Sequence, residues 1–493
     1  MRIVITQGHL KEYSGSEMVT LELAEYLVTQ GAFVTIATPV FEKPISAEFS
    51  KLKNVTVVAI DNEEFNYEIE HQPPDIAWIH HQLIPKGLLS LRAIEQTKFI
   101  FHHMSPYHPQ EFPILFEAEN NLADVVLFNS QETKNSLMEK GFKFSKPSLY
   151  IFGNPAPEIF KTVRQINSKK RLQKVLIVSN HLPDEVFNAA KLLEKNGISV
   201  DIAGINHKAS YGRVTNEQIE NADAIISIGK TVQYSLVAGR PIYCYDKFGG
   251  PGYINRENFK KARELNFSGR GFKVKTAEII YDELTEGFVS QLQESRALRQ
   301  MYSEGLFLSA QMEQVLELTA EHRDKKLSKS DIASTDALNF MLVRFFERIA
   351  AHTNALDKIT QLEDEIRATN SAEIELTNKL NEIYRSKLWK FTAQTRRPLH
   401  HIRKVKRHLV LYKNKSSGAL RKTLSQEKLV RVGNINLSQL EYKDLAKQLV
   451  QLNDTLIDWD EQGKRRPTGV SVIVLVYNNI ELTRRCIESV MDN

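Results

Sequence analysis

The chain has 493 residues, a formal net charge of +5, 42% hydrophobic residues and 25% charged residues. This is the composition of ordinary globular protein, and it excludes a collagen, a mucin and a wholly disordered chain. Because a domain averages about 150 residues, the length predicts about three folded units. The only two cysteines, Cys244 and Cys486, lie far apart in the sequence. They exclude a disulfide framework and a thiolate zinc cluster and favour a reducing compartment.

The positive charge is concentrated in one stretch. Residues 386–426 contain 12 lysines and arginines and no acidic residue, so the other 452 residues together carry a net charge of −7. The basic surface of a typical nucleic-acid binder is therefore not indicated. The longest apolar run, residues 472–476, is far shorter than the roughly 18 residues that cross a bilayer. With a strand pattern starting at residue 2, we expect neither a signal peptide nor a transmembrane helix.

Short β-branched runs alternate with helix-length amphipathic segments from Met1 to about Gly271, a pattern typical of parallel sheets built from βαβ units. The expected strands are 2–6, 33–37, 55–60, 76–79, 98–102, 125–128, 175–178, 199–202, 224–227 and 241–245. Ten strands exceed one ordinary sheet, and a polar, lysine-rich stretch at 158–170 divides them. We therefore predict an α/β fold with two Rossmann-like domains, at residues 1–160 and 161–330.

A helical connector is expected to follow. Within residues 335–390, apolar residues recur at mostly three- and four-residue intervals from Leu356 to Ile383, with two polar interruptions. This pattern predicts a coiled coil that would allow self-association, and the alternative is a solitary amphipathic helix that packs on a domain. Residues 391–467 are predicted to form a basic amphipathic helical linker.

Three interpretations of the basic stretch 386–426 stay open. Trp389 and Phe391 lie among its cations and could anchor it at an anionic lipid surface, which is the interpretation we favour. It could instead be a solvated linker, or a helix that packs on another domain. Nucleic acid fits least, because no aromatic platform accompanies the charge.

Two glycine-bearing turns could hold a ligand. Gly15 and Ser16 precede a helix expected over residues 18–30, where glycine permits close approach and the helix start offers N–H groups to phosphate or sugar oxygens. Lys230 and Thr231 follow Gly229 at a strand-to-helix junction and would add an ammonium to such donors. Each pair could equally form only a tight turn or a capped helix.

Four histidines, His80, His81, His102 and His103, lie at the carboxyl ends of two expected strands, where open parallel sheets bind ligands. Adjacent residues on a strand point to opposite faces, so neither pair can easily chelate one ion. No metal site is therefore expected in this part of the chain.

Four segments in this order and spacing resemble a GT-B glycosyltransferase similar to family 4, over about residues 1–270: 123–133 (ADVVLFNSQET), 222–231 (ADAIISIGKT), 235–241 (SLVAGRP) and 249–252 (GGPG). The resemblance implies two domains that face a cleft, with the acceptor on the first and a nucleotide-sugar donor on the second, and no cofactor. It implies a hexosyl- or deoxyhexosyltransferase that acts on a glycan or lipid-linked acceptor in bacterial surface-polysaccharide synthesis, such as O-antigen or capsule, with retention.

The resemblance also implies site residues. His102 and His103 become the catalytic candidates, because a family histidine at this location touches the donor. Tyr234 stands where retaining members carry a ribose-binding glutamate, and Asn180 and His181 stand near the usual diphosphate-binding pair of cations. The donor-binding candidates are therefore Gly15, Ser16, Asn180, His181, Lys230, Thr231, Tyr234, Gly249 and Gly250.

The tail carries a second resemblance. Residues 470–490 resemble the opening of a family 2 GT-A glycosyltransferase, with Leu475 at the usual proline. One strand and one helix cannot bury a core, so residues 468–493 are expected to be the truncated start of such a domain. Only that missing domain would need a divalent metal. Asp458-Trp459-Asp460 imitates its metal-binding motif but lies in a helical pattern.

The same residues leave two alternatives to a GT-B enzyme. The first is a catalytically silent GT-B module that binds glycan or scaffolds a downstream GT-A enzyme. The second is a nicotinamide-dependent Rossmann enzyme, which is weak because the first strand lacks a following Gly-x-Gly-x-x-Gly. We expect a cytoplasmic enzyme, peripheral at the inner face of the membrane, with no nucleic-acid partner.

Overall fold

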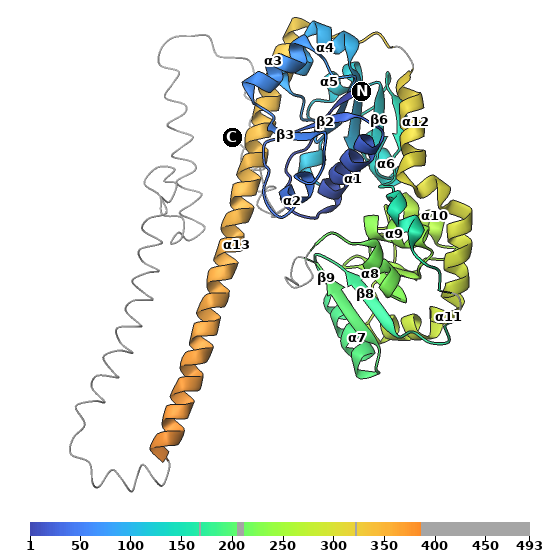
Figure 1. Ribbon diagram of the computed structural model, residues 1–493, viewed down its shortest axis with the longest axis vertical. Coiled ribbons are helices and arrows are strands. Elements are labelled where there is room, and N and C mark those ends of the chain that lie inside the picture. Colours follow the sequence, from blue (N-terminus) through green and yellow to red (C-terminus); the bar gives the residue numbers. More distant parts are fainter. Residues whose placement is uncertain (167–168, 205–211, 321–322, 386–493) are drawn as a thin grey trace, which may run out of the picture. The chain divides into compact units, whose positions relative to one another are not determined.

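The computed structural model describes residues 1–166, 169–204, 212–320 and 323–385, and the chain as far as Thr369 forms one compact unit (Figure 1). Two separate sheets organise this unit, which confirms the predicted α/β class with two Rossmann-like domains. The first sheet has the order β3-β2-β1-β4-β5-β6-β7, and all its neighbouring strands are parallel. Its strands are β1 (Arg2–Thr6), β2 (Phe33–Thr38), β3 (Val55–Ala59), β4 (Ile76–His80), β5 (Lys98–His103), β6 (Val125–Phe128) and β7 (Ser148–Ile151).

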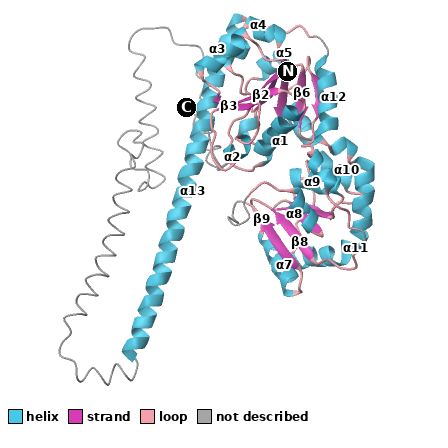
Figure 2. Ribbon diagram, in the orientation of Figure 1, coloured by secondary structure: helices cyan, strands magenta, loops and turns pink. Residues whose placement is uncertain are grey.

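Helices cover both faces of the first sheet, as a parallel sheet requires (Figure 2). One face packs against α1 and α12, and the other packs against α3 to α6 and the first part of α13. The elements are α1 (Gly15–Thr29), α2 (Ser46–Phe49), α3 (Glu63–His71), η1 (Lys86–Leu89), α4 (Leu91–Gln96), η2 (Pro109–Glu111), α5 (Phe116–Leu122), α6 (Gln131–Glu139), α12 (Leu308–Ala320) and α13 (Lys329–Arg385).

The second sheet has the order β12-β11-β10-β8-β9, in which only β12 is antiparallel to its neighbour. Its strands are β8 (Lys174–Val178), β9 (Ser199–Ala203), β10 (Ala224–Ser227), β11 (Ile242–Asp246) and β12 (Gly249–Tyr253). Its helices and turns are η3 (Glu158–Thr162), α7 (Asp184–Lys195), α8 (Asn216–Asn221), α9 (Lys230–Ala238), α10 (Phe259–Glu264), α11 (Ala277–Tyr302) and η5 (Glu304–Leu306).

All ten expected strands are present, and the described residues form two further strands that the sequence did not predict. β7 is only half-buried and lacks a clear apolar run. β12 contains the glycine-rich segment 249–252, which the sequence did not predict as a strand, and it pairs with β11. A Cβ at Gly250 would lie 2.1 Å from the Cys244 carbonyl oxygen, so close packing of the two strands accounts for this glycine.

The chain crosses between the domains twice, and the crossings lie side by side. The Ala156 N–H donates to the Leu306 carbonyl at 2.8 Å, and the Leu308 N–H donates to the Ala156 carbonyl at 2.9 Å. After the second crossing, Met312 and Val315 of α12 are buried against the first sheet. Residues 308–320, which the sequence assigned to the second domain, therefore belong to the core of the first.

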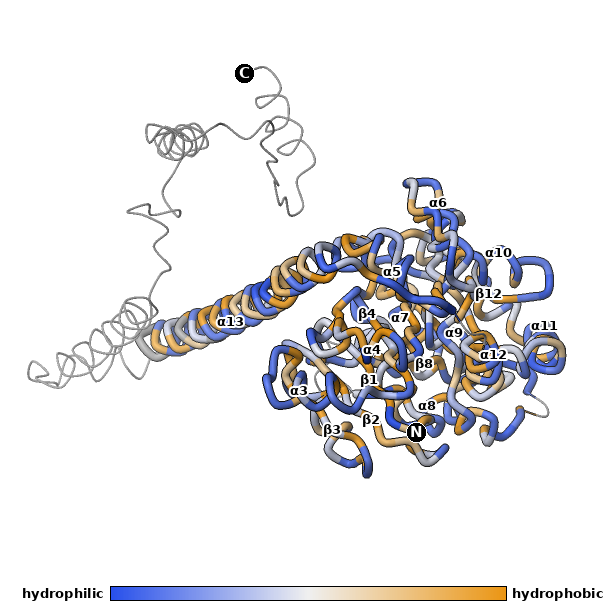
Figure 3. The backbone as a smooth tube through the Cα atoms, turned by 90° about the horizontal axis from the view of Figure 1, so that it is seen from above, coloured by the Kyte–Doolittle hydropathy of each residue, from blue (hydrophilic) through white to orange (hydrophobic). Residues whose placement is uncertain are grey.

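Helix α13 begins on the first domain. Its Phe346 is 1% exposed and lies against Gly8, where a Cβ would be only 2.2 Å from the ring. Further along, apolar and polar residues alternate around the helix (Figure 3), and Leu356, Ile359 and Ile366 are exposed. The structure confirms a helix over residues 335–385, and the coiled coil stays a prediction.

Residues 386–493 lie outside the described residues. The basic linker at 391–467 and the GT-A-like start at 468–493 therefore stay predictions. Within the described ranges, no helix is both long enough and apolar enough to span a bilayer.

Replacing Phe346 with alanine tests how α13 is attached. Because the ring is buried against Gly8 and the first-domain core, we expect Phe346→Ala to lower the free energy of unfolding by about 3 to 5 kcal/mol. Phe340→Ala is the matched control on the same helix, because Phe340 is 59% exposed. Equal losses for both variants in urea denaturation would contradict the docking of α13 through Phe346.

Candidate functional site

A buried carboxylate of the first domain contacts three groups of the second. Glu22 lies in α1, and its side chain is 2% exposed. Lys230 Nζ lies 2.7 Å from its Oε2, the Tyr234 hydroxyl donates to its Oε1 at 2.5 Å, and Arg213 Nη2 lies 3.8 Å from Oε1. We call Glu22, Lys230, Tyr234 and Arg213 the Glu22 clamp. It joins the two domains through groups that are largely withheld from water.

Local sequence places the members of the clamp. The Glu17 carboxylate accepts the N–H groups of Glu12 at 2.9 Å and Ser14 at 3.2 Å, which fixes the loop where α1 begins. Glu22 then falls on the buried face of this helix. In the second domain α9 begins at Lys230, and Tyr234 lies four residues later, so both project from the same face.

The surroundings of Tyr234 make it a hydrogen-bond donor. Its ring stacks on Phe160 with centroids 4.2 Å apart and planes 10° apart. Burial raises the pKa of Tyr234 well above its usual value, and the charge of Glu22 raises it further, so the hydroxyl keeps its proton. Lys230 also donates to the Pro155 carbonyl at 3.0 Å. Two of the predicted donor-binding residues thus already bind an anion of their own chain.

Arg213 balances the charge of the clamp. Its guanidinium binds Glu25 through two hydrogen bonds, at 2.5 and 2.7 Å, while remaining close to Glu22. Two carboxylates therefore meet two cations. Buried charges of this kind persist only while they are paired, because a lone charge in such a site loses its hydration without compensation.

A second, more exposed contact joins the domains. Arg270 binds the Glu132 carboxylate of α6 through two hydrogen bonds, at 2.9 and 2.6 Å. The Tyr107 hydroxyl donates to the same carboxylate at 2.8 Å, and the guanidinium lies 4.8 Å from the Tyr107 ring centroid. This contact and the Glu22 clamp both connect the two α/β domains, as does the hydrogen bond that the Asn154 amide donates to Asn266 Oδ1 at 3.0 Å.

The two catalytic candidates lie on opposite faces of β5. His102 is 2% exposed and lies against Trp78 and Phe152, and neither ring nitrogen has a hydrogen-bond partner among the described residues. Burial lowers the pKa of His102 to about 3, so the ring is neutral near pH 7. The charge of Lys230 contributes to this lowering, so His102 and the clamp lie within electrostatic reach of each other.

His103 is in a different state. Burial acts to lower its pKa, but the carboxylates of Glu119 and Glu111 outweigh burial, and the pKa of His103 is raised. Its Nε2 lies 2.7 Å from Glu119 Oε1. Glu119 therefore favours the protonated form of His103 and holds its ring within the first domain.

His81, which follows β4, supports the loop after β1. His81 Nδ1 accepts the Gly8 N–H at 3.0 Å, and its Nε2 lies 3.3 Å from Glu111 Oε1. His81 and Gln82 both have left-handed backbone conformations, with φ of 52° and 54°, which turn the chain sharply after β4. Among the described residues, no group of three or more histidine, cysteine or acidic side chains could hold a metal ion.

The other predicted donor residues also lie near the carboxyl ends of strands. Ser16 Oγ accepts a hydrogen bond from the Gln7 amide at 3.3 Å, and Gly15 has open space where a Cβ would point. Asn180 and His181 follow β8, Thr231 is the second residue of α9, and Gly249 and Gly250 begin β12. Of the predicted set, the described contacts bring Lys230 and Tyr234 together at one partner. The ligand-binding roles of all nine stay predictions.

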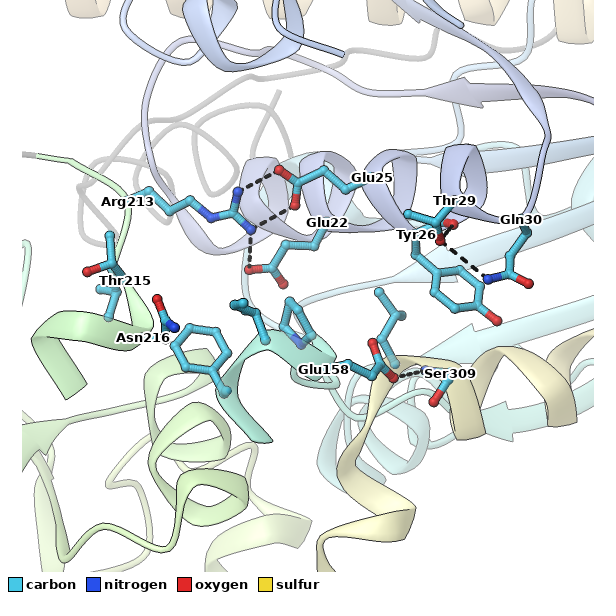
Figure 4. Close-up of a pocket in the computed structure, with 15 residues that line it drawn as sticks. Glu22, Glu25, Tyr26, Thr29, Gln30, Glu158, Arg213, Thr215, Asn216 and Ser309 are labelled. Carbon is cyan, nitrogen blue, oxygen red and sulfur yellow. Dashed lines mark hydrogen bonds and ion pairs between the residues drawn. The ribbon is translucent and has the colours of Figure 1, made fainter. Parts of the chain in front are cut away.

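A cavity of about 620 Å³ opens beside the clamp (Figure 4). It is lined by residues from the second half of α1, the first chain crossing, the start of α8 and the start of α12. Figure 4 shows Arg213 reaching toward Glu22 and Glu25 at one side of it, with Tyr26 and Glu158 further along. None of the predicted catalytic or donor-binding residues lines this cavity.

Among the residues that connect the domains, the sequence missed Glu22, Glu25, Arg213, Glu132 and Arg270. Glu22 carried a weak signal, because it is an acidic residue within the otherwise apolar stretch Met18-Val19-Thr20-Leu21-Glu22-Leu23-Ala24. The sequence carried no signal for Arg213 or Arg270, because each arginine is more than a hundred residues from its partner in the sequence.

Comparisons with known proteins match the chain only to solved structures. No family model matches, and no curated protein matches. A glycosyltransferase from Rickettsia africae is 12% identical, with 64% of this chain and 97% of that chain covered and a TM-score of 0.46. An α-glucosyltransferase in complex with UDP and a 13-mer DNA is 12% identical, with 65% and 100% covered and a TM-score of 0.43. The spinosyn forosaminyltransferase is 14% identical, with 65% and 100% covered and a TM-score of 0.39. At these values the likeness carries no argument, and the fold rests on the two sheets themselves.

Removing the charge of Glu22 should loosen the domains. Glu22→Gln leaves Lys230 buried without its anion, so we expect a loss of about 3 kcal/mol in unfolding free energy and a larger radius of gyration by small-angle X-ray scattering. Glu294→Gln is the control, because Glu294 pairs with Arg256 inside the second domain and is 25% exposed, so its loss should cost about 1 kcal/mol or less. If the two variants behave alike, the clamp does not hold the domains together.

Acid should destabilise the fold through His102. The pKa of His102 in the folded chain, about 3, lies below the ordinary value of 6.5. Between these two pH values His102 is protonated in the unfolded chain but stays neutral in the folded one. The stability that comes from burying His102 in its neutral form is fully present above pH 6.5. As the pH falls below 6.5, the free energy of unfolding drops by about 1.4 kcal/mol per pH unit. In urea denaturation, the unaltered chain should lose stability between about pH 7 and pH 5. His102→Phe should lose roughly 2 kcal/mol less over the same range.

The exposed His71 supplies the control for this measurement. His71→Phe should leave the pH dependence as it is in the unaltered chain. An unchanged slope in His102→Phe would show that His102 is not buried in its neutral form.

Proposed function

We propose that this chain is a glycosyltransferase that moves a sugar from a nucleotide diphosphate donor to a glycan or lipid-linked acceptor in bacterial surface-polysaccharide synthesis, with retention. One observation carries the proposal. At the start of α9 in the second Rossmann-like domain, Lys230 and Tyr234 already hold a carboxylate. A set of groups that binds one oxyanion can bind another, and a departing diphosphate is the oxyanion of this reaction.

The chemistry makes use of that set. In the transfer, the bond between the anomeric carbon and a diphosphate oxygen breaks, and the oxygen keeps the electron pair. The acceptor oxygen forms the new bond to the anomeric carbon, and its proton passes to a base, for which the neutral ring of His102 is the candidate. Negative charge therefore grows on the diphosphate, where the Lys230 ammonium and the N–H groups of the first turn of α9 can stabilise it.

Glu22 must then release Lys230 to the donor. Because one ammonium cannot pair fully with both anions in the same place, binding of a diphosphate competes with the clamp. Donor binding would therefore be coupled to the contact between the domains, and part of the binding energy would be used to break that contact.

Of the two catalytic candidates, we rank His102 first. Its ring is neutral and has no hydrogen-bond partner among the described residues, whereas His103 is already committed to Glu119. We propose that His102 contacts the donor or takes up a proton once the domains separate. We also propose that the module needs no metal or other cofactor, and that it works in the cytoplasm at the inner face of the membrane.

The clamp also favours a second candidate function. If Glu22 never releases Lys230, the module is a catalytically silent GT-B unit that binds glycan or scaffolds a partner enzyme. The cavity beside the clamp would then be the space available to a ligand. The two candidates differ in whether a nucleotide sugar binds at all.

Calorimetry with a panel of UDP-, GDP- and dTDP-sugars separates them, and two variants should shift the affinity in opposite directions. Lys230→Ala should weaken donor binding about tenfold or more, because the diphosphate loses its cation. Glu22→Gln should tighten it about fivefold or more, because the competing anion is gone. Absence of binding by the unaltered chain would refute the enzyme. Weaker binding in both variants would show that Glu22 does not compete with the donor.

A further inference from the structure

Four large apolar side chains are exposed on two neighbouring loops. Tyr107, Phe112 and Ile114 follow the carboxyl end of β5, with exposed fractions of 58%, 41% and 53%. Phe248 lies in the turn after β11 in the second domain and is 47% exposed. Single exposed apolar residues are ordinary, but four in one place are not.

Cations connect the three aromatic side chains into one surface, and Ile114 lies two residues from Phe112 in the same loop. Lys140 Nζ lies 5.2 Å from the Phe112 ring centroid and donates to the Pro106 carbonyl, next to Tyr107. The Arg270 guanidinium lies 4.8 Å from the Tyr107 centroid and 6.0 Å from that of Phe248. Lys247 Nζ lies 5.1 Å from the Phe248 centroid. We call these seven residues, Tyr107, Phe112, Ile114, Phe248, Lys140, Lys247 and Arg270, the Tyr107 surface.

The charge of this surface is positive. The acidic residue bonded to it, Glu132, is paired with Arg270 and receives the Tyr107 hydroxyl. Lys140 and Lys247 place two further ammonium groups beside the exposed rings, and Asp246 lies within electrostatic reach of Lys247. An apolar surface rimmed by cations is complementary to a layer of anionic headgroups over hydrocarbon.

We propose that the Tyr107 surface binds an anionic lipid membrane. Tyr107, Phe112, Ile114 and Phe248 would enter the interfacial layer, while the lysines extend toward the lipid phosphates. Ile114 has no ring to stack on a sugar, and the cations would gain little from a neutral glycan, so the lipid surface fits better than an acceptor glycan. This proposal deepens the place at the membrane that the proposed function gives the chain, and it rests on side chains of the two domains and not on the basic stretch 386–426.

The surface also lies where the chemistry is expected. Its loops follow the carboxyl ends of β5 and β11, the ends at which parallel sheets bind ligands. A membrane bound there would meet both domains at once. Its binding would therefore depend on the contact between Arg270 and Glu132, which joins the two halves of the surface.

Vesicle binding by the full chain tests the proposal. Sedimentation with vesicles of phosphatidylcholine and phosphatidylglycerol in equal amounts should retain the protein, and vesicles of phosphatidylcholine alone should retain less. The triple variant Phe112→Ser, Ile114→Ser, Phe248→Ser should bind the mixed vesicles at least about tenfold more weakly. Lys140→Glu with Lys247→Glu should lower binding to the mixed vesicles selectively.

A matched control removes three exposed apolar side chains elsewhere on the first domain. Phe33→Ser, Tyr67→Ser and Leu91→Ser replace residues that are 61%, 65% and 71% exposed, and vesicle binding should be unchanged. Hydrogen exchange of the segment 105–116 should slow when mixed vesicles are added to the unaltered chain. The proposal is overturned by absence of vesicle binding, by full binding of the triple variant, by an equal loss in the control, or by unchanged exchange at 105–116.

Discussion

The buried carboxylate of Glu22 is the constraint on which the arrangement of the two domains depends. It is nearly inaccessible to water, and its partners Lys230, Tyr234 and Arg213 all come from the other domain. The two domains have separate sheets and separate apolar cores. Their relative position is therefore fixed by a few polar contacts and by the paired chain crossings at Ala156, contacts that can break without unfolding either core.

The same contacts give the site its chemical character. A cation and a phenol that hold a carboxylate form a preorganised oxyanion site, and the carboxylate that fills it belongs to the protein. An anionic ligand that binds Lys230 would have to compete with Glu22, so its affinity and the contact between the domains would be linked. His102 lies within electrostatic reach of Lys230 and is kept neutral by burial, so a change at the clamp also changes the surroundings of this histidine. The Arg270–Glu132 contact gives the domains a second, more solvated connection.

The sequence predicted the sheets well because β-branched runs between amphipathic helices report local structure directly. It failed where tertiary packing overrides local signals. Glycine and proline are depleted in strands, so residues 249–253 were not predicted as one, but they form β12 because glycine permits the close approach to Cys244. Helix α12 is amphipathic in sequence, yet nothing local indicates which sheet it covers. The sequence named Lys230 and Tyr234 as donor-binding candidates, which stays a prediction, and it did not predict their contact with Glu22 or the approach of Arg213. The distance of 188 residues between Arg213 and its partner Glu25 explains why.

In the proposed mechanism, an anionic ligand must displace Glu22 from Lys230. The most direct test is a crystal structure of the protein with a nucleotide diphosphate bound. The account predicts that Lys230 Nζ contacts a phosphate oxygen and that its distance to Glu22 Oε2 has grown well beyond the present 2.7 Å. A bound nucleotide diphosphate with the Lys230–Glu22 ion pair still intact would contradict it.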